Sequence, residues 1–338
     1  MQFLKRDADL IRLLGDCDVA VLQARSNEDL LIVIDRLKAF KGGLQFDHAQ
    51  SWVLLLLAIV SAIPALAGLV LMWFATACLG FASLYIWMSR SAALDELPKN
   101  IARKCSFLSN GLRDPGGTAD ERLSWLDEEF DDYDRGNDSR RIEASARGVY
   151  QGRRHQLSFV FHHLHYVNAH NKTQSDGESE KVYEHFDRFS LVVDFPWVSG
   201  VTVRSDLPSK KNTRPKVFET TSDEFNRVFS FAGDSELDCA KFATPTTLAF
   251  LLGLHRRLKK VNLEFSSQGH LCLSFDDAEV MAYKDPGTLE DLASFYANIE
   301  RGLELPNLFP VLALVHELAE LHDNNFDLPL KVADEMEQ

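Results

Sequence analysis

The residues that decide the fold run from Trp52 to Ser89 and read WVLLLLAIVSAIPALAGLVLMWFATACLGFASLYIWMS. No Asp, Glu, Lys or Arg occurs between Asp47 and Arg90. About 20 apolar residues cross a bilayer as a helix, so this stretch has roughly the length of two spans. It predicts a pair of transmembrane helices, with the rest of the chain organised around a membrane anchor.

The middle of the stretch contains Pro64 and Gly68. Proline removes a helical hydrogen-bond donor and glycine frees the backbone, so we expect the chain to reverse here. The first helix is expected near 47–63 and the second near 69–89. One long tilted helix, or a helical hairpin buried in a soluble core, is the alternative. The polar-rich residues 1–46 precede the stretch and exclude a cleaved signal peptide.

Basic residues flank the apolar stretch on both sides. They are Arg36, Lys38 and Lys41 before it, and Arg90, Lys99, Arg103 and Lys104 after it. Cationic flanks stay in the cytoplasm, and two passes return both flanks to the same side. The five cysteines form no CxxC pair, as expected in a reducing compartment. We therefore expect both termini to be cytoplasmic.

The 338 residues carry a formal net charge of −14, which argues against general nucleic-acid binding. Five segments are expected along the chain. They are N-terminal cytosolic helices (1–46), a transmembrane helical hairpin (47–89), juxtamembrane helices with an acidic linker (90–140), a cytosolic α+β domain (141–324) and a tail (325–338).

The juxtamembrane segment divides into a helix and an acidic run. The helix is expected at 91–113, with Pro98 as its start or a kink. The run from Asp127 to Asp138 reads DEEFDDYDRGND and lacks the residue order of a calcium-binding loop. It is interpreted as a solvated acidic linker.

From Arg141 onward the pattern is typical of an α+β fold, in which an antiparallel sheet is packed with helices mostly on one side. Val261–Phe265 and Leu271–Phe275 flank Ser266–Gly269 and predict a β-hairpin. Thr118 with Glu121 is a capping-box pattern, and Thr244 before a proline is a helix start. Two closing helices are expected near 289–303 and 308–322.

Several short segments in this order resemble the bacterial domain-of-unknown-function family 3137. They are Arg147-Gly-Val-Tyr-Gln-Gly-Arg153, Leu191-Val-Val-Asp-Phe195, Glu224-Phe-Asn-Arg-Val-Phe229 and Ala243-Thr-Pro-Thr246. The resemblance covers roughly residues 50–323 and departs at the acidic insert and the histidine-rich strand. It implies a two-span protein of the bacterial cytoplasmic membrane, with a cytosolic α+β domain and no established reaction.

The best metal candidate lies in the histidine-rich segment that contains His155, His162, His163, His165 and His170. On a strand, His163 and His165 share one face, and His162 points to the other. His185 of the return strand could complete a set of three zinc ligands. The alternative, polar positions on a solvated sheet face, is favoured, so no metal or other cofactor is expected.

Two further patterns have ordinary structural explanations. His316 and Glu320 resemble a zincin helix without its second histidine, so an amphipathic helix with Leu314, Leu318 and Leu321 inward is expected. A basic loop contains Lys210, Lys211 and Arg214, which could meet phosphate or lipid headgroups, although a solvated loop is favoured.

No GxSxG element and no Walker phosphate loop occurs. The sequence therefore favours a membrane-anchored cytosolic binding or sensory module without catalytic activity. Its expected partners are the lipid bilayer and a protein, either a different one or a second copy of the chain. A membrane-anchored hydrolase, perhaps metal-dependent, and a two-span membrane-permeabilising effector are the alternatives.

Overall fold

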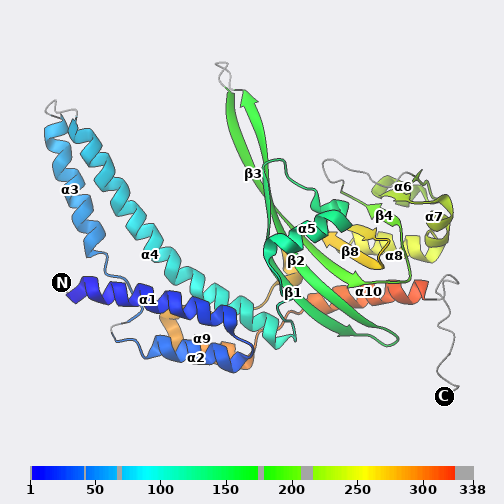
Figure 1. Ribbon diagram of the computed structural model, residues 1–338, viewed down its shortest axis with the longest axis horizontal. Helices are drawn as coiled ribbons and strands as arrows, with labels where there is room; N and C mark the ends of the chain where they lie inside the picture. The colour runs from blue at the N-terminus through cyan, green and yellow to red at the C-terminus, as the bar shows by residue number, and fades with distance from the viewer. Residues whose placement is uncertain (1, 42, 67–70, 174–178, 207–215, 324–338) are drawn as a thin grey trace. The chain divides into compact units, whose positions relative to one another are not determined.

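The computed structural model describes residues 2–41, 43–66, 71–173, 179–206 and 216–323 (Figure 1). The chain forms two compact units, Met1–Asn110 with Tyr283–Glu304, and Gly111–Ala282 with Leu305–Gln338. The predicted domain at 141–324 differs from this division in two places. Residues 111–140, predicted as part of a separate segment, belong to the second unit. Residues 283–304 belong to the first unit, because Leu289, Phe295 and Ile299 are buried in its core.

The described part of the first unit is helical. Its elements are α1 (Gln2–Gln23), α2 (Asn27–Lys38), α3 (Ala49–Leu66), α4 (Leu71–Ser109), the 3-10 turn η3 (Leu289–Asp291) and α9 (Leu292–Arg301). Ser26 caps α2 by accepting from the Asp29 amide, and the Asp29 carboxylate accepts from the Ser26 amide in return. This reciprocal cap is a capping box, which stabilises the start of α2.

A helical core joins α1, α2, α9 and the C-terminal part of α4. Its buried side chains include Leu10, Leu14, Val21, Leu30, Ile34, Leu37, Leu97, Ile101, Cys105, Phe295 and Ile299. Asn100 of α4 donates to Asp18 of α1 at 2.8 Å, and Asn110 donates to the Leu303 carbonyl at 2.8 Å. The chain after residue 282 thus returns to close a core begun by the N-terminal helices.

The apolar stretch forms α3 and the first half of α4, which lie side by side and antiparallel (Figure 1). Ser83 Oγ donates to the Ser51 carbonyl at 2.7 Å, and the Ser61 and Thr76 hydroxyls lie 2.9 Å apart. Pro64 lies inside α3, whereas Gly68 lies outside the described residues.

The predicted end of the second helix near Ser89 is wrong, and of the two roles expected for Pro98, a helix start or a kink, the start is wrong. Helix α4 runs through both positions to Ser109. An internal proline removes one helical hydrogen bond and costs roughly 3 kcal/mol. Here the flanking Leu97 and Ile101 are fully buried in the core, and this packing offsets that cost.

The described residues of the second unit form an eight-stranded antiparallel sheet, which confirms the α+β class. The strands are β1 (Ser139–Gln151), β2 (Gln156–Thr173), β3 (Ser179–Asp194), β4 (Val201–Arg204), β5 (Lys216–Val217), β6 (Ser230–Gly233), β7 (Asn262–Phe265) and β8 (His270–Phe275). Their order is β1-β2-β3-β8-β7-β4-β6-β5. The β7–β8 hairpin around Ser266–Gly269 is as predicted.

The two faces of this sheet differ in chemistry. Cross-strand pairs such as Leu191 with Leu273, and Leu273 with Leu263, form an apolar face. The alternate positions form a polar face, which includes Arg188, Ser190, Ser274, Asn262, Glu264 and Arg204. Side chains alternate along a strand, so one sheet presents both surfaces.

Helices cover the two faces unequally. Rings of α6 (Asp223–Val228) and α7 (Glu236–Phe242) contact the apolar face, and α8 (Pro245–His255) and α10 (Leu308–His322) pack beside them. Helix α5 (Ala119–Glu129) and the 3-10 turn η1 (Asp131–Tyr133) lie on the polar face. The described helices are therefore mostly on one side, as expected.

The β2–β3 hairpin is longer than its neighbours. Pairing of β2 with β1 ends at Val167, and pairing of β3 with β8 begins at Phe189. Residues 168–173 and 179–184 therefore form a two-stranded arm, which projects from the sheet in Figure 1. A lone two-stranded ribbon is marginally stable, so contacts at its base matter for its order.

Candidate functional site

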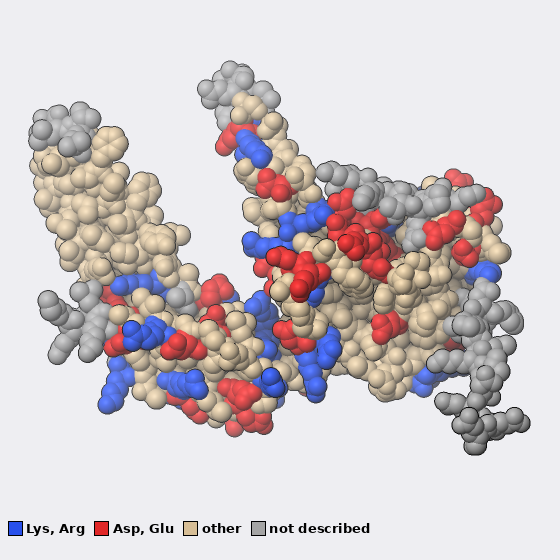
Figure 2. All heavy atoms as spheres, viewed as in Figure 1, with Lys and Arg blue, Asp and Glu red and all other residues tan. Residues whose placement is uncertain are grey.

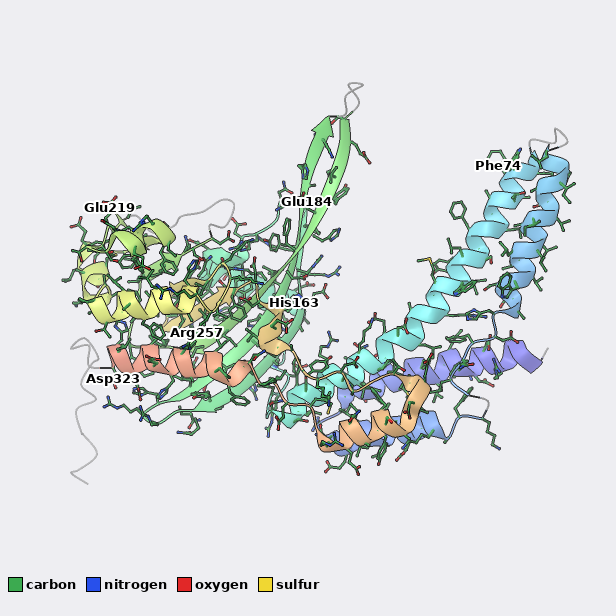
Figure 3. All side chains as sticks on the ribbon, turned by 180° about the vertical axis from the view of Figure 1, so that it is seen from behind. Phe74, His163, Glu184, Glu219, Arg257 and Asp323 are labelled. Carbon is green, nitrogen blue, oxygen red and sulfur yellow. The ribbon has the colours of Figure 1, made fainter. Side chains whose placement is uncertain are left out.

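The paired helices α3 and α4 expose large apolar side chains over most of their surface. These are Trp52, Val53, Leu56, Leu57, Ile59, Val60, Ile63 and Leu66 on α3, and Met72, Trp73, Phe74, Phe81, Leu84, Tyr85, Trp87 and Met88 on α4. Figure 2 shows this surface without charged residues, and Figure 3 labels Phe74 near its far end. Soluble proteins rarely leave so large an apolar surface exposed.

The side chains buried between α3 and α4 are small or carry a hydroxyl group. Ser51, Ala58 and Ser83 are buried there, with exposed fractions of 1%, 5% and 5%. A soluble helix pair buries large apolar residues and exposes polar ones. This pair has the reverse arrangement, which is typical of helices packed in lipid.

By length and composition, one helix in the described part of the chain, Met72–Ser109, could cross a membrane. The apolar helix Ala49–Pro64 is too short to meet the same criterion of length. The predicted two-span anchor is therefore not confirmed, although its two helices are present and paired.

A group of polar residues, here called the collar, surrounds the base of α3 and α4. Arg90 forms an ion pair with buried Asp7 at 3.1 Å. It also donates to the Asp47 carbonyl at 2.9 Å and to Gln50 Oε1 at 3.0 Å. The collar (Arg6, Asp7, Asp47, Gln50 and Arg90) marks the level at which the uncharged surface ends.

The three histidines singled out as metal candidates do come together on β2 and β3. His163 Nε2 and His165 Nδ1 lie 2.8 and 3.0 Å from the same oxygen, Oδ1 of Asp187. His165 Nε2 lies 3.1 Å from His185 Nδ1. Figure 3 labels His163 at the base of the arm and Glu184 nearer its tip. We call the four bonded residues, His163, His165, His185 and Asp187, the histidine cluster.

The hydrogen bonds of the histidine cluster centre on one carboxylate. Asp187 accepts from His163 Nε2 and His165 Nδ1, and His165 also shares a hydrogen bond with His185. Burial opposes ionisation of Asp187, but the two imidazole hydrogen bonds lower the pKa of this carboxyl. Within the described residues, no three His, Cys, Asp or Glu side chains are placed to hold a metal ion.

The remaining histidines of the segment lie elsewhere. His162 points to the polar face, where its Nδ1 contacts Ser145 Oγ at 2.8 Å, and burial lowers its pKa to about 3. His155 lies 3.3 Å from Asp323 and His170 lies on the arm. The basic-loop residues Lys210, Lys211 and Arg214 lie outside the described residues.

The acidic run is not a solvated linker. Phe130, Asp132, Tyr133 and Arg135 are all buried, and residues 131–133 form η1 against the polar face of the sheet. Asp132, with an exposed fraction of 1%, accepts from Arg188 Nε at 2.9 Å and from Asn262 Nδ2 at 2.7 Å. Because strand residues supply these partners, the run folds inward.

A second pair of buried charges lies beside the first. Arg204 donates to Glu264 Oε1 at 2.8 Å and to Asp131 Oδ2 at 2.7 Å. Burial raises the pKa of Glu264 to about 7, although Arg204 opposes this shift. Burial also opposes the charge of Asp132, but Arg188 and Arg135 hold the pKa of this carboxyl well below its usual range. We call these charged residues the ionic network; they are Asp131, Asp132, Arg135, Arg188, Arg204 and Glu264.

The sequence pattern alone pointed to no residue of the ionic network as a site. A signal was present, because Glu264 lies between Leu263 and Phe265, and Arg188 and Arg204 each lie next to an apolar strand residue. A charged residue in a buried strand requires a partner, and the acidic run supplies nearby carboxylates.

Helix α10 buries a different face from the one predicted. Leu318 is buried, but Leu321 is exposed and Leu314 is only partly covered. His316 and His322 are buried instead. The backbone amides of Arg154 and His155 donate to His316 Nε2, and His322 stacks on Phe242 at 4.9 Å between centroids. Burial lowers the pKa of His322 to about 4.

No family model, curated protein or solved structure matches this chain. The resemblance to family 3137 therefore stays a prediction.

Proposed function

We propose that this protein is a membrane-anchored cytosolic module that binds or senses a partner, with α3 and α4 as its bilayer anchor. The observation that carries the proposal is the reversed burial of these helices. Their large apolar side chains point outward, while Ser51, Ala58 and Ser83 lie between them. In lipid, outward apolar side chains are solvated and small residues allow close helix packing.

The dimensions of the anchor support insertion across the bilayer. Helix α3 has 18 residues and is about 27 Å long at about 1.5 Å per residue. The hydrocarbon core is about 30 Å thick, so a slightly thinned bilayer or a turn within the far headgroups accommodates it. Trp52 and Trp87, whose rings lie 6.1 Å apart, occupy the level next to the collar where indoles favour the interface.

The collar supports an orientation with both termini in the cytoplasm. Because α3 and α4 are antiparallel, the cationic flanks of the apolar stretch lie at the same end, and Arg90 bonds Asp47 and Gln50 across it. Cationic flanks stay on the cytoplasmic side. The resemblance to family 3137 adds the bacterial cytoplasmic membrane as the location.

The second unit supports a role in binding or sensing. Two mutually bonded sets of titratable residues, the ionic network and the histidine cluster, lie on its sheet. The cluster is partly exposed at the base of the arm, where a ligand can reach it.

Cysteine accessibility tests the anchor and its orientation. Glu28→Cys in the first unit and Glu219→Cys in the second introduce one exposed thiol each. A membrane-impermeant maleimide should label neither in intact spheroplasts and both after lysis. Labelling of one site alone would require an odd number of passes, and labelling of both would invert the orientation.

Extraction tests membrane insertion separately. The protein should remain in the membrane pellet after alkaline carbonate treatment. Replacing three outward residues, Leu56→Lys, Val60→Lys and Phe81→Lys, should release it. Release of the unaltered protein by carbonate would contradict the proposal.

A further inference from the structure

The first unit carries a groove of about 720 Å³ below the anchor. Its apolar lining includes Leu44, Leu94 and Tyr283, which are partly buried against the helical core, and the buried Leu289. The loop that closes one side is held by Asn298, which donates to the Pro286 carbonyl at 3.0 Å. The volume lies within the range of about 300–1,000 Å³ that is usual for binding sites.

The charged side chains that line this groove are mostly acidic. Three are carboxylates, Asp95, Asp285 and Glu290, and one is the ammonium group of Lys99. Lys99 is already paired with Glu96 at 3.3 Å. Asp95 and Glu290 are exposed, and their carboxylates have no hydrogen-bond or ion-pair partner in the described part of the chain. The groove therefore combines an apolar floor with unpaired negative charge.

The position of the groove along α4 indicates what could reach it. Leu94 lies four residues after Arg90, and Ala102 lies twelve residues after it. At about 1.5 Å per residue these are roughly 6 and 18 Å along the helix axis. If the collar lies at the membrane surface, the groove lies in the adjacent cytoplasmic layer. Integral membrane proteins carry an excess of Lys and Arg in this layer.

We propose that the groove docks the basic, amphipathic juxtamembrane segment of an integral membrane partner. The apolar floor receives the apolar side chains of the segment, and Asp95 and Glu290 receive its cations. The assignment of the partner to the membrane rests on the proposed function. Binding should weaken as salt rises, because exposed charge pairs are screened.

A peptide-binding experiment with the full chain in a neutral maltoside detergent tests this. The probe is a fluorescent peptide of alternating Lys–Leu pairs, and its acidic counterpart replaces each Lys with Glu. The Lys peptide should bind and the Glu peptide should not. Asp95→Asn with Glu290→Gln should weaken binding about two- to thirtyfold, since each exposed pair contributes about 0.2–1 kcal/mol.

The matched control is Asp9→Asn with Asp16→Asn. These carboxylates are exposed on α1, do not line the groove, and remove the same net charge. The control should leave peptide affinity unchanged. Equal weakening by both double variants, or equal binding of both peptides, would overturn the docking site.

The experiment is separable from the test of the anchor because it is performed in detergent. Retained membrane insertion without peptide binding overturns the docking site alone. If the protein binds the peptide but alkaline carbonate releases it from the membrane, the assignment of the partner to the membrane is overturned. Loss of both overturns both proposals.

Discussion

Replacing Asp132 by asparagine should destabilise the second unit substantially, although Asp132 belongs to an acidic run. The carboxylate is buried and accepts from Arg188, Arg135 and Asn262. Removing one partner of a buried ion pair costs about 3–5 kcal/mol. Arg188 keeps Asp276 at 2.7 Å and Arg135 keeps Asp206 at 2.8 Å, so the lower end, about 3 kcal/mol, is expected.

Amide hydrogen exchange of the full chain in detergent measures this cost locally. Strand β8 lies inside the sheet, so its amides report the opening of the second unit. A loss of about 3 kcal/mol corresponds to roughly a hundredfold faster exchange. Glu128→Gln is the control, because Glu128 is an exposed acid of the same run. It should change exchange by less than threefold, since surface substitutions stay within about 0.5 kcal/mol.

The comparison of these two variants separates the interpretations of the acidic run. A solvated linker predicts equal, small effects for both. The ionic network predicts a large effect at Asp132 alone. A difference of less than tenfold in β8 exchange between the variants would refute the network as a source of stability.

Three further outcomes are expected. Burial raises the pKa of Glu264 to about 7, so the stability that its protonated carboxyl contributes is fully present below the unfolded pKa near 4.3 and is lost as pH rises through 7. In urea titrations, the free energy of unfolding of the unaltered protein relative to Glu264→Gln should therefore increase from pH 8 to pH 5. Gly152→Ala should lower the melting temperature, because its Cβ would lie 2.0 Å from an imidazole carbon of α10, whereas Gly253→Ala has open space in α8 and should raise it. Elemental analysis of the purified chain should find no stoichiometric zinc; one zinc per chain that is lost in His163→Ala with His165→Ala would instead make the histidine cluster a metal site.

Local signals predicted much of the secondary structure. Capping at Thr118 and Thr244 starts α5 and α8 as expected, because each cap depends on residues within one turn. The β7–β8 hairpin was also predictable, since turn and strands are adjacent in sequence. The helix end predicted near Ser89, which α4 does not have, shows the limit: burial of Leu97 and Ile101 depends on helices that are distant in the chain.

The candidate site was predicted in part. Strand alternation predicted that His163 and His165 share one face. In the register of β2 and β3 the direct partner of His165 is Asp187, and His185 lies opposite Val167, two residues further along β2. The same alternation gave no role to Asp187, the oxygen acceptor that both imidazoles share. For α10, helical spacing alone could not choose between two possible buried faces. The backbone amides of the β1–β2 turn and the Phe242 ring decide that His316 and His322 lie inward.

By itself, the sequence determined the uncharged apolar stretch, the antiparallel α+β class and the helix starts, because each depends on neighbouring residues. Only the tertiary structure decided that the acidic run is buried, that residues 283–304 close the N-terminal core, and that α10 turns its histidines inward. These features depend on charge pairs and packing between segments far apart in the chain. Asp132 and Arg188 lie 56 positions apart, yet each lowers the cost of burying the other.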